Sequence, residues 1–148
     1  MTDSGDGEMV DVLLVEDDAG DALIVREAFE YHKVRNKLHV VTDGEQALRF
    51  VRREGEFADA PRPGLIMLDL NLPRRAGTEV LAEIKADPTL CVIPVVILTT
   101  SRSEEDVLRS YSLHANAYVS KPVEFEQFMD AIRQIDNFFV SVVRLPST

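Results

Sequence analysis

Acidic side chains end two predominantly apolar segments of this chain. Residues 65–68 are all apolar and are followed by Asp69, and a second run at residues 10–15 is followed by Glu16 and Asp17. Short apolar runs of this kind predict strands buried on both faces, as in a parallel sheet. Because an ionised carboxylate at the end of a buried strand is costly unless something pairs with it, these three acids are the first candidates for a functional site.

The chemistry open to three neighbouring carboxylates depends on what relieves their repulsion, which is either a proton or a cation. Mg²⁺ is the usual cation, because it prefers oxygen ligands and typically takes one or two carboxylates together with waters and a phosphate. We expect Asp17 and Asp69 to bind Mg²⁺ directly. A backbone carbonyl near Asn71 and a water held by Glu16 would complete its ligands.

Two further segments end in residues that can interact with a phosphoryl group. Thr99 offers a hydroxyl donor at the end of a later apolar run, and Lys121 offers an ammonium that can pair with a carboxylate or a phosphoryl oxygen. A carboxylate nucleophile at Asp69, together with a metal, a lysine and a hydroxyl, can carry out phosphoryl transfer. In that reaction, positioning and charge neutralisation do most of the catalysis.

The spacing of apolar residues predicts the elements that must bring these side chains together. Strands are expected at residues 10–15, 37–41, 65–69, 93–100 and 115–120. Helices are expected from 19 to about 32, from 43 through 51, around Val80, Leu81 and Ile84 up to Asp87, after Ser101 or Ser103, and from about 124 to 144. Five strands alternating with five helices predict an α/β fold with a doubly wound parallel sheet. A change of strand order after the first strand would bring the acids, Thr99 and Lys121 to one edge of that sheet.

Local signals predict how the first two helices begin. Asp18 or Asp21 is expected to cap the first helix. Asp43, with Gln46 three residues later, predicts a capping box for the second helix. Residues 54–63 are polar and contain two prolines, so we expect a loop there.

The charge of the chain limits its partners. The net charge is −10, and no cluster of lysines or arginines offsets it. This balance argues against binding to nucleic acid or to an anionic membrane, and it favours a protein or a cation as the partner. The adjacent Arg74 and Arg75 are expected to form a solvated turn.

The single cysteine and the first residues indicate the compartment. Cys91 has no second cysteine to pair with, which excludes an internal disulfide and favours a reducing environment. Residues 1–8 are acidic and glycine-rich, which predicts neither a signal peptide nor a membrane anchor. We therefore expect a cytoplasmic protein with one domain.

The acids belong to a longer ordered pattern that resembles a known family. In chain order the pattern is Glu16-Asp17, Asp69, Pro73, Gly77, Thr99 and Lys121-Pro122. With this order and spacing, the chain resembles the response-regulator receiver domain of two-component signalling systems over about residues 10 to 140. The resemblance implies a flavodoxin-like receiver fold, with a flexible acidic N-terminus at 1–9, a receiver domain with an extended last helix at 10–145 and a tail at 146–148.

The resemblance also implies an activity. Asp69 would accept a phosphoryl group from the phosphohistidine of a histidine kinase, with Mg²⁺ bound as described. Thr99 and Tyr118 would be switch residues, the Thr99 hydroxyl moving toward the phosphoryl oxygen and Tyr118 turning into the space that it leaves. The chain would catalyse only its own phosphorylation and dephosphorylation. We expect no output domain after residue 148, and therefore signalling by docking, dimerisation or transfer of the phosphoryl group, without binding to DNA.

The predicted last helix is more apolar than one buried face requires. The residues that step by three and four and can serve the core are Phe125, Phe128, Ile132, Ile135, Phe139 and Val142, and those left over are Phe138, Val140, Val143 and Leu145. This surplus favours a homodimer built on the last helix, with extra packing along the chain's own core as the alternative. The extended helix, the proline-containing loop and the Asp-Pro before the fourth strand resemble the stand-alone receivers that serve phytochrome-type histidine kinases. That resemblance implies a light-sensing kinase as donor.

Other functions compete with this interpretation. A receiver that signals by docking alone, without phosphorylation, is one alternative, and the complete set of site residues argues against it. A metal-dependent phosphatase with an aspartyl nucleophile resembles a different pattern, in which the nucleophile ends the first strand, whereas the candidate here ends the third. A flavin-binding version of the fold would need a phosphate cradle after the first strand, which this chain lacks. The chain itself departs from the receiver pattern at Glu16, where aspartate is commoner.

Overall fold

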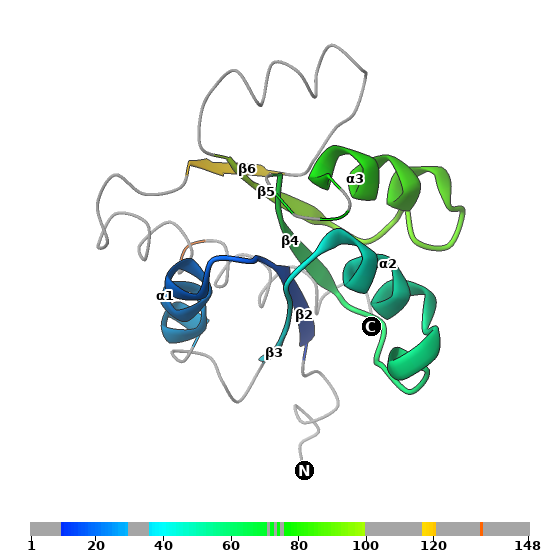
Figure 1. The fold of residues 1–148 in the computed structure, drawn as a ribbon, viewed down its shortest axis with the longest axis horizontal. Helices are drawn as coiled ribbons and strands as arrows, with labels where there is room; N and C mark the ends of the chain where they lie inside the picture. Colours follow the sequence, from blue (N-terminus) through cyan, green and yellow to red (C-terminus); the bar gives the residue numbers. More distant parts are fainter. Residues whose placement is uncertain are drawn as a thin grey trace.

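The computed structural model of the 148-residue chain describes residues 10–29, 36–70, 72, 74, 76–99, 117–120 and 134. Its elements, in chain order, are β2 (Val10–Val15), α1 (Ala19–Phe29), β3 (Asn36–Val41), α2 (Gly44–Arg52), the 3₁₀ helix η3 (Gly55–Phe57), β4 (Leu65–Asp69), α3 (Gly77–Ala86), β5 (Val95–Thr99) and β6 (Ala117–Ser120) (Figure 1). The helices predicted after Ser101 or Ser103 and at 124–144 lie outside the described residues.

All five strands form one parallel sheet in the order β3-β2-β4-β5-β6. The strand order reverses between β2 and β4, which is the change of order predicted from the sequence. In the register of the sheet, Val15 pairs with Leu68, and Asp69 pairs with Leu98. The carboxyl ends of β2, β4 and β5 therefore lie side by side at one edge.

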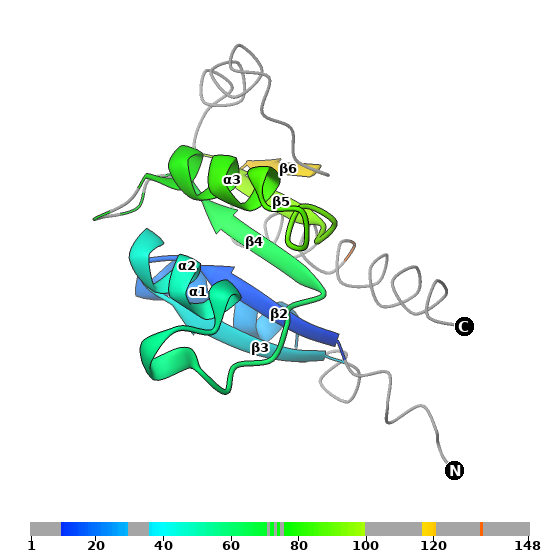
Figure 2. The same ribbon diagram turned by 90° about the vertical axis from the view of Figure 1, so that its right-hand side faces the viewer.

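Helices cover both faces of the sheet, as a doubly wound fold requires. Helix α1 lies on one face, and α2 and α3 lie on the other (Figure 1). After a quarter turn, α2 and α3 lie in front of the strands and α1 lies behind them (Figure 2). The predicted α/β fold with a parallel sheet is confirmed.

Alternate strand residues face the two helical layers. Leu13, Ile66 and Ile97 belong to the apolar cluster that also holds Ala47, Leu48, Val51, Val80, Leu81 and Ile84 of α2 and α3. The residues that follow them in the strands, Leu14, Met67 and Leu98, are also fully buried and lie toward the opposite face because side chains alternate along a strand. Burial of each such side chain contributes about 1.5–3 kcal/mol, so the strand ends are carried by a firmly packed core.

The described helices begin as local chemistry predicts, with one difference. Asp18 caps α1, since its Oδ1 accepts a hydrogen bond of 2.9 Å from the N–H of Asp21. Asp43 caps α2, accepting a hydrogen bond of 2.8 Å from the N–H of Gln46. The Gln46 side chain does not complete a capping box at Asp43; its Oε1 accepts a hydrogen bond of 2.9 Å from the N–H of Thr42, one residue earlier.

Two of the differences between the observed and the expected element boundaries have a structural cause. The segment 54–63, expected to be a loop, contains η3, because Phe57 packs against Phe50 with ring centroids 5.4 Å apart and joins the core. Strand β5 begins at Val95 instead of residue 93, because the Ile93 N–H closes a turn onto the Leu90 carbonyl and Pro94 has no N–H to donate. In the described part of the chain, no helix has the length and apolar composition needed to cross a bilayer.

Candidate functional site

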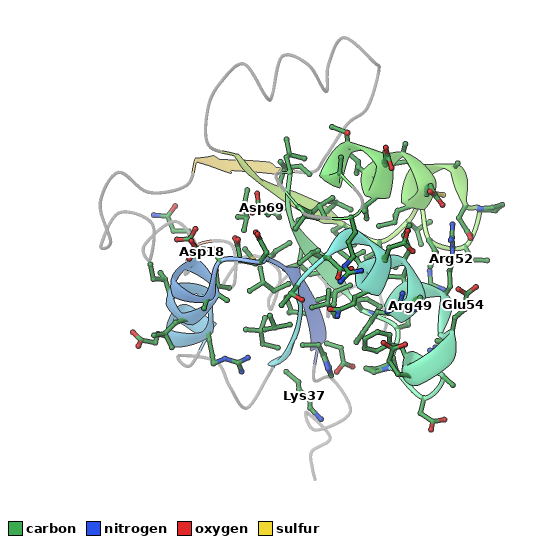
Figure 3. The ribbon with its side chains drawn as sticks, viewed as in Figure 1. Asp18, Lys37, Arg49, Arg52, Glu54 and Asp69 are labelled. Carbon is green, nitrogen blue, oxygen red and sulfur yellow. The ribbon has the colours of Figure 1, made fainter. Side chains whose placement is uncertain are left out.

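The three predicted acids meet at the carboxyl edge of the sheet. Glu16 and Asp17 follow β2, Asp69 ends the adjacent β4, and one carboxylate oxygen from each lies within 4.8 Å of the others. Figure 3 shows Asp69 at this edge, with Asp18 nearby at the start of α1. The convergence predicted for Glu16, Asp17 and Asp69 is confirmed.

These carboxylates differ in their contact with solvent. Glu16 is 1% exposed and Asp69 is 2% exposed, whereas Asp17 is exposed. Two unit charges 4 Å apart near a protein surface repel by about 4 kcal/mol, and burial increases the cost of ionisation. All the donors are oxygens, which fits a hard divalent cation better than a transition metal that prefers nitrogen or sulfur.

Backbone contacts hold the β2–α1 turn in place. The Glu16 N–H donates to the Val41 carbonyl at 3.0 Å, which ties this acid to the end of β3. Oε2 of Glu16 accepts a hydrogen bond of 3.1 Å from the N–H of Asp18. Glu16 therefore shapes the turn that presents Asp17 at the same time as it contributes to the acidic cluster.

The loop after Asp69 returns closely over the end of β4. The Gly77 N–H donates to the Leu70 carbonyl at 3.1 Å. A Cβ built on Gly77 would lie 2.5 Å from the Asp69 carbonyl oxygen and 2.6 Å from the Leu70 Cα. Only glycine permits this approach, and this explains the glycine of the sequence pattern in physical terms.

The remaining predicted site residues are placed only in part. Thr99 ends β5, one residue beyond the Leu98 that pairs with Asp69, so its backbone lies at the same edge as the acids. Tyr118 lies in β6, paired with Ile97. Asn71 and Lys121 lie outside the described residues, and their roles stay predictions.

One contact beside the site has no signal in the sequence. The Arg74 Nε lies 3.1 Å from the Asp43 Oδ2, and the Arg74 side chain is 70% exposed while that of Asp43 is 10% exposed. The expectation of a solvated turn at Arg74 is therefore incomplete, because the guanidinium is paired. The two residues are far apart in the chain, and no local pattern links them.

Comparison with known proteins agrees with the fold and shows the family. The family model of the response regulator receiver domain matches residues 12–133. This chain therefore belongs to the response regulator receiver domain family. A receiver is the class of signalling protein in which a doubly wound sheet carries an acidic site at its carboxyl edge.

The proteins similar to this chain include a cyanobacterial phytochrome response regulator. Response regulator Rcp1 of Synechocystis sp. is 43% identical over 136 residues, which cover 92% of each chain. The crystal structure of the phosphorylated cyanobacterial phytochrome response regulator RcpA superposes with a TM-score of 0.84 at 45% identity, covering 90% of this chain and 95% of RcpA. The structure of the Mn²⁺-bound form of Rcp1 superposes with a TM-score of 0.83 at 42% identity, covering 90% of this chain and 96% of Rcp1. The predicted resemblance to phytochrome response regulators is confirmed.

Proposed function

We propose that this receiver accepts a phosphoryl group on Asp69 in a Mg²⁺-dependent reaction and signals through altered contacts with other proteins. The observation that carries the proposal is the meeting of Glu16, Asp17 and Asp69, with carboxylate oxygens within 4.8 Å, at the edge where ligands bind in this class of sheet. Neither capping nor packing accounts for acids at two adjacent strand ends.

In the proposed reaction, an Asp69 carboxylate oxygen bonds to the phosphorus while the bond from phosphorus to the donor imidazole nitrogen breaks. The imidazole keeps the electron pair and takes up a proton. Bound Mg²⁺ would supply the positive charge that the phosphoryl oxygens need in the transition state. Asp17 and Asp69 would hold that ion directly, a carbonyl near Asn71 would contribute, and Glu16 would act through water.

Thr99 and Lys121 would act on the phosphoryl oxygens. The position of Thr99 at the end of β5, beside β4, supports a role for its hydroxyl as a donor. The Lys121 ammonium would neutralise a further oxygen. Tyr118, one strand further along the sheet, would turn into the space that the Thr99 hydroxyl leaves, and so carry the change to the surface.

A histidine kinase is the proposed donor, and a phytochrome-type kinase is the specific expectation. This expectation rests on the similarity to RcpA, which is described as a cyanobacterial phytochrome response regulator. The net charge of −10 supports a protein partner over nucleic acid or an anionic membrane. Output would then pass through protein contacts or through onward transfer of the phosphoryl group.

A homodimer built on the last helix is part of the proposal. Its support is the surplus of apolar residues in the sequence between 125 and 145, a segment that lies outside the described residues. Light scattering of the full chain should give the mass of two copies, and a Phe138→Glu variant should give the mass of one. A wild-type chain that stays monomeric at micromolar concentration would contradict this part.

The proposed phosphorylation is tested by intact-mass spectrometry after incubation with acetyl phosphate. The wild type should gain one phosphoryl group with Mg²⁺ and none when the metal is chelated, and Asp69→Asn should gain none. The matched control is Asp59→Asn, which removes an acid from the exposed segment after η3 and should behave as the wild type. A wild type that binds Mg²⁺ but gains no phosphoryl group would favour a receiver that signals by docking alone.

A further inference from the structure

The ion pair between Asp43 and Arg74 joins two residues that have no role of their own in the proposed reaction. Arg74 lies in the loop between β4 and α3, which begins directly after Asp69. Asp43 is the N-cap of α2, and the residue as a whole is buried. Its Oδ1 accepts a hydrogen bond from the Gln46 N–H, and its Oδ2 lies 3.1 Å from the Arg74 Nε. Both carboxylate oxygens of Asp43 are therefore engaged.

The backbone of Arg74 is in an unusual conformation. Its φ is 68°, in the left-handed region where residues other than glycine, asparagine and aspartate are uncommon. A non-glycine residue in this region is held there by the structure around it. The ion pair to Asp43 is a contact that the Arg74 side chain makes from this backbone conformation.

The ion pair links the loop that begins after Asp69 to the segment that follows β3, which is itself bonded to Glu16. On one side, the Arg74 loop starts at Asp69 and is pinned by the bond from the Gly77 N–H to the Leu70 carbonyl. On the other side, Asp43 lies two residues after Val41, whose carbonyl accepts the N–H of Glu16.

We infer that Asp43 and Arg74 are positioning residues that set the spacing between Asp69 and the acids that follow β2, and thereby the affinity of the site for Mg²⁺. The inference rests on the proposed function, since it concerns the same metal. The effect of Asp43 and Arg74 passes through the loop that begins after Asp69 and through the end of β3, where the Val41 carbonyl accepts the Glu16 N–H. This effect is separable from any direct effect of their charges.

Charge alone predicts a different outcome from positioning. If the two residues acted only through their long-range fields, loss of the Asp43 charge would weaken Mg²⁺ binding and loss of the Arg74 charge would strengthen it. If Asp43 and Arg74 instead hold their segments in position, loss of either charge weakens Mg²⁺ binding. The sign of the Arg74 effect therefore separates the two explanations.

The test compares Asp43→Asn, Arg74→Gln and the double variant by Mg²⁺ titration of the full chain. Asparagine can still cap α2, because it is about as good an N-cap residue as aspartate. Glutamine removes the charge at position 74 and keeps an unbranched polar side chain. Each single variant should weaken Mg²⁺ binding about two- to fivefold, the range expected for a partly exposed ion pair. The double variant should be no weaker than either single variant, because both break the same contact.

A matched control is Arg52→Gln, which breaks the ion pair between α2 and α3 that joins Arg52 to Glu83 at 2.6 Å. It should leave Mg²⁺ affinity unchanged. Amide hydrogen exchange in the metal-free protein gives a second readout, in which the Glu16 and Gly77 amides should exchange faster in Asp43→Asn and Arg74→Gln than in the wild type and in Arg52→Gln.

Two results would overturn the inference. One is a Mg²⁺ affinity in Arg74→Gln that equals or exceeds that of the wild type, and the other is unchanged exchange at Glu16 and Gly77 in both single variants. A wild type that fails to bind Mg²⁺ would instead overturn the proposed function, together with the metal part of this inference. Amide hydrogen exchange at Glu16 and Gly77 would then decide whether the ion pair holds the β4–α3 loop and the segment between β3 and α2.

Discussion

Gly77 lies against the carbonyl oxygen of Asp69, so closely that a Cβ at this position would lie 2.5 Å from that oxygen. The first residue of α3 is thus packed onto the backbone of the proposed phosphoryl acceptor. The N–H of Gly77 also donates to the Leu70 carbonyl, so a hydrogen bond joins the start of α3 to the residue that follows β4.

Gly77→Ala should therefore destabilise the fold and disturb the site together. Relief of the clash requires a backbone shift, which typically costs about 1–3 kcal/mol. Urea unfolding measures this loss in the free energy of unfolding. Gly20→Ala in α1 is the control, because its Cβ would approach only the side-chain oxygen of Asp18, at 3.2 Å, and alanine favours the helix. Equal stability of Gly77→Ala and the wild type would contradict the close packing.

Asp17 and Asp18 are adjacent acids with different roles, and a pair of variants separates them. Asp17→Asn should weaken Mg²⁺ binding at least about tenfold, because it removes a ligand charge worth about 1.4 kcal/mol or more. Asp18→Asn makes the same change of charge one residue later but keeps the cap of α1, so its effect should be much smaller. Calorimetric titration with Mg²⁺ measures both, and equal losses would argue that only the overall charge matters.

The proposed switch couples Thr99 to Tyr118. In protein with fluorine-labelled tyrosine, phosphorylation should shift the Tyr118 resonance in the wild type and should leave it unshifted in Thr99→Ala, although Asp69 is still modified. Thr89→Ala, in the exposed turn after α3, is the matched control and should shift as the wild type does. The same shift in Thr99→Ala as in the wild type would contradict the coupling.

Asp87 ends α3 and gives the fold a defined acid dependence. Its Oδ1 accepts hydrogen bonds of 2.8 Å from the hydroxyl and from the N–H of Thr89, and the N–H of Leu90 lies at 3.2 Å. The hydroxyl bond is the main cause of a lowered pKa for Asp87, and the backbone bonds add to it. A carboxyl with a lowered pKa in the folded state stabilises the fold above its unfolded pKa of about 3.9, and this contribution is lost as the pH falls through the lowered value.

Asp87→Asn should accordingly be less stable than the wild type at pH 7, and the difference should shrink as the pH is lowered below about 4. Urea unfolding at a series of pH values measures the difference between the two proteins, which removes the acid dependence that they share. If the difference in the free energy of unfolding between the two proteins were the same at pH 7 and below pH 4, the charge of the Asp87 carboxylate would not contribute to stability.

The sequence predicted the elements that burial patterns control. The apolar run before Asp69 defines β4 at Leu65–Asp69, and the run at residues 10–15 defines β2, because strands buried on both faces leave a continuous apolar signal. A change of strand order after the first strand was predicted from the rules for doubly wound sheets, and the meeting of Glu16, Asp17 and Asp69 followed from it.

Side-chain contacts that do not follow from the sheet topology could not be predicted in this way. The pairing of Asp43 with Arg74 depends on how the α2 N-terminus and the β4–α3 loop meet in space, and neither residue has a local pattern that indicates it. The short helix η3 was not predicted, because Phe57 stands alone in a mostly polar segment and gives no periodic apolar pattern. Its packing on Phe50 is a tertiary contact. Binary patterning identifies buried strands well, but it does not show which polar side chains pair.

The position of the phosphoryl group is the most direct test of the central proposal. The protein is incubated with acetyl phosphate and Mg²⁺, the product is treated with borohydride to convert phosphoaspartate to homoserine, and the peptides are sequenced by tandem mass spectrometry. The account predicts homoserine at position 69 and at no other aspartate. Homoserine at Asp17 or Asp18, with Asp69 intact, would contradict it.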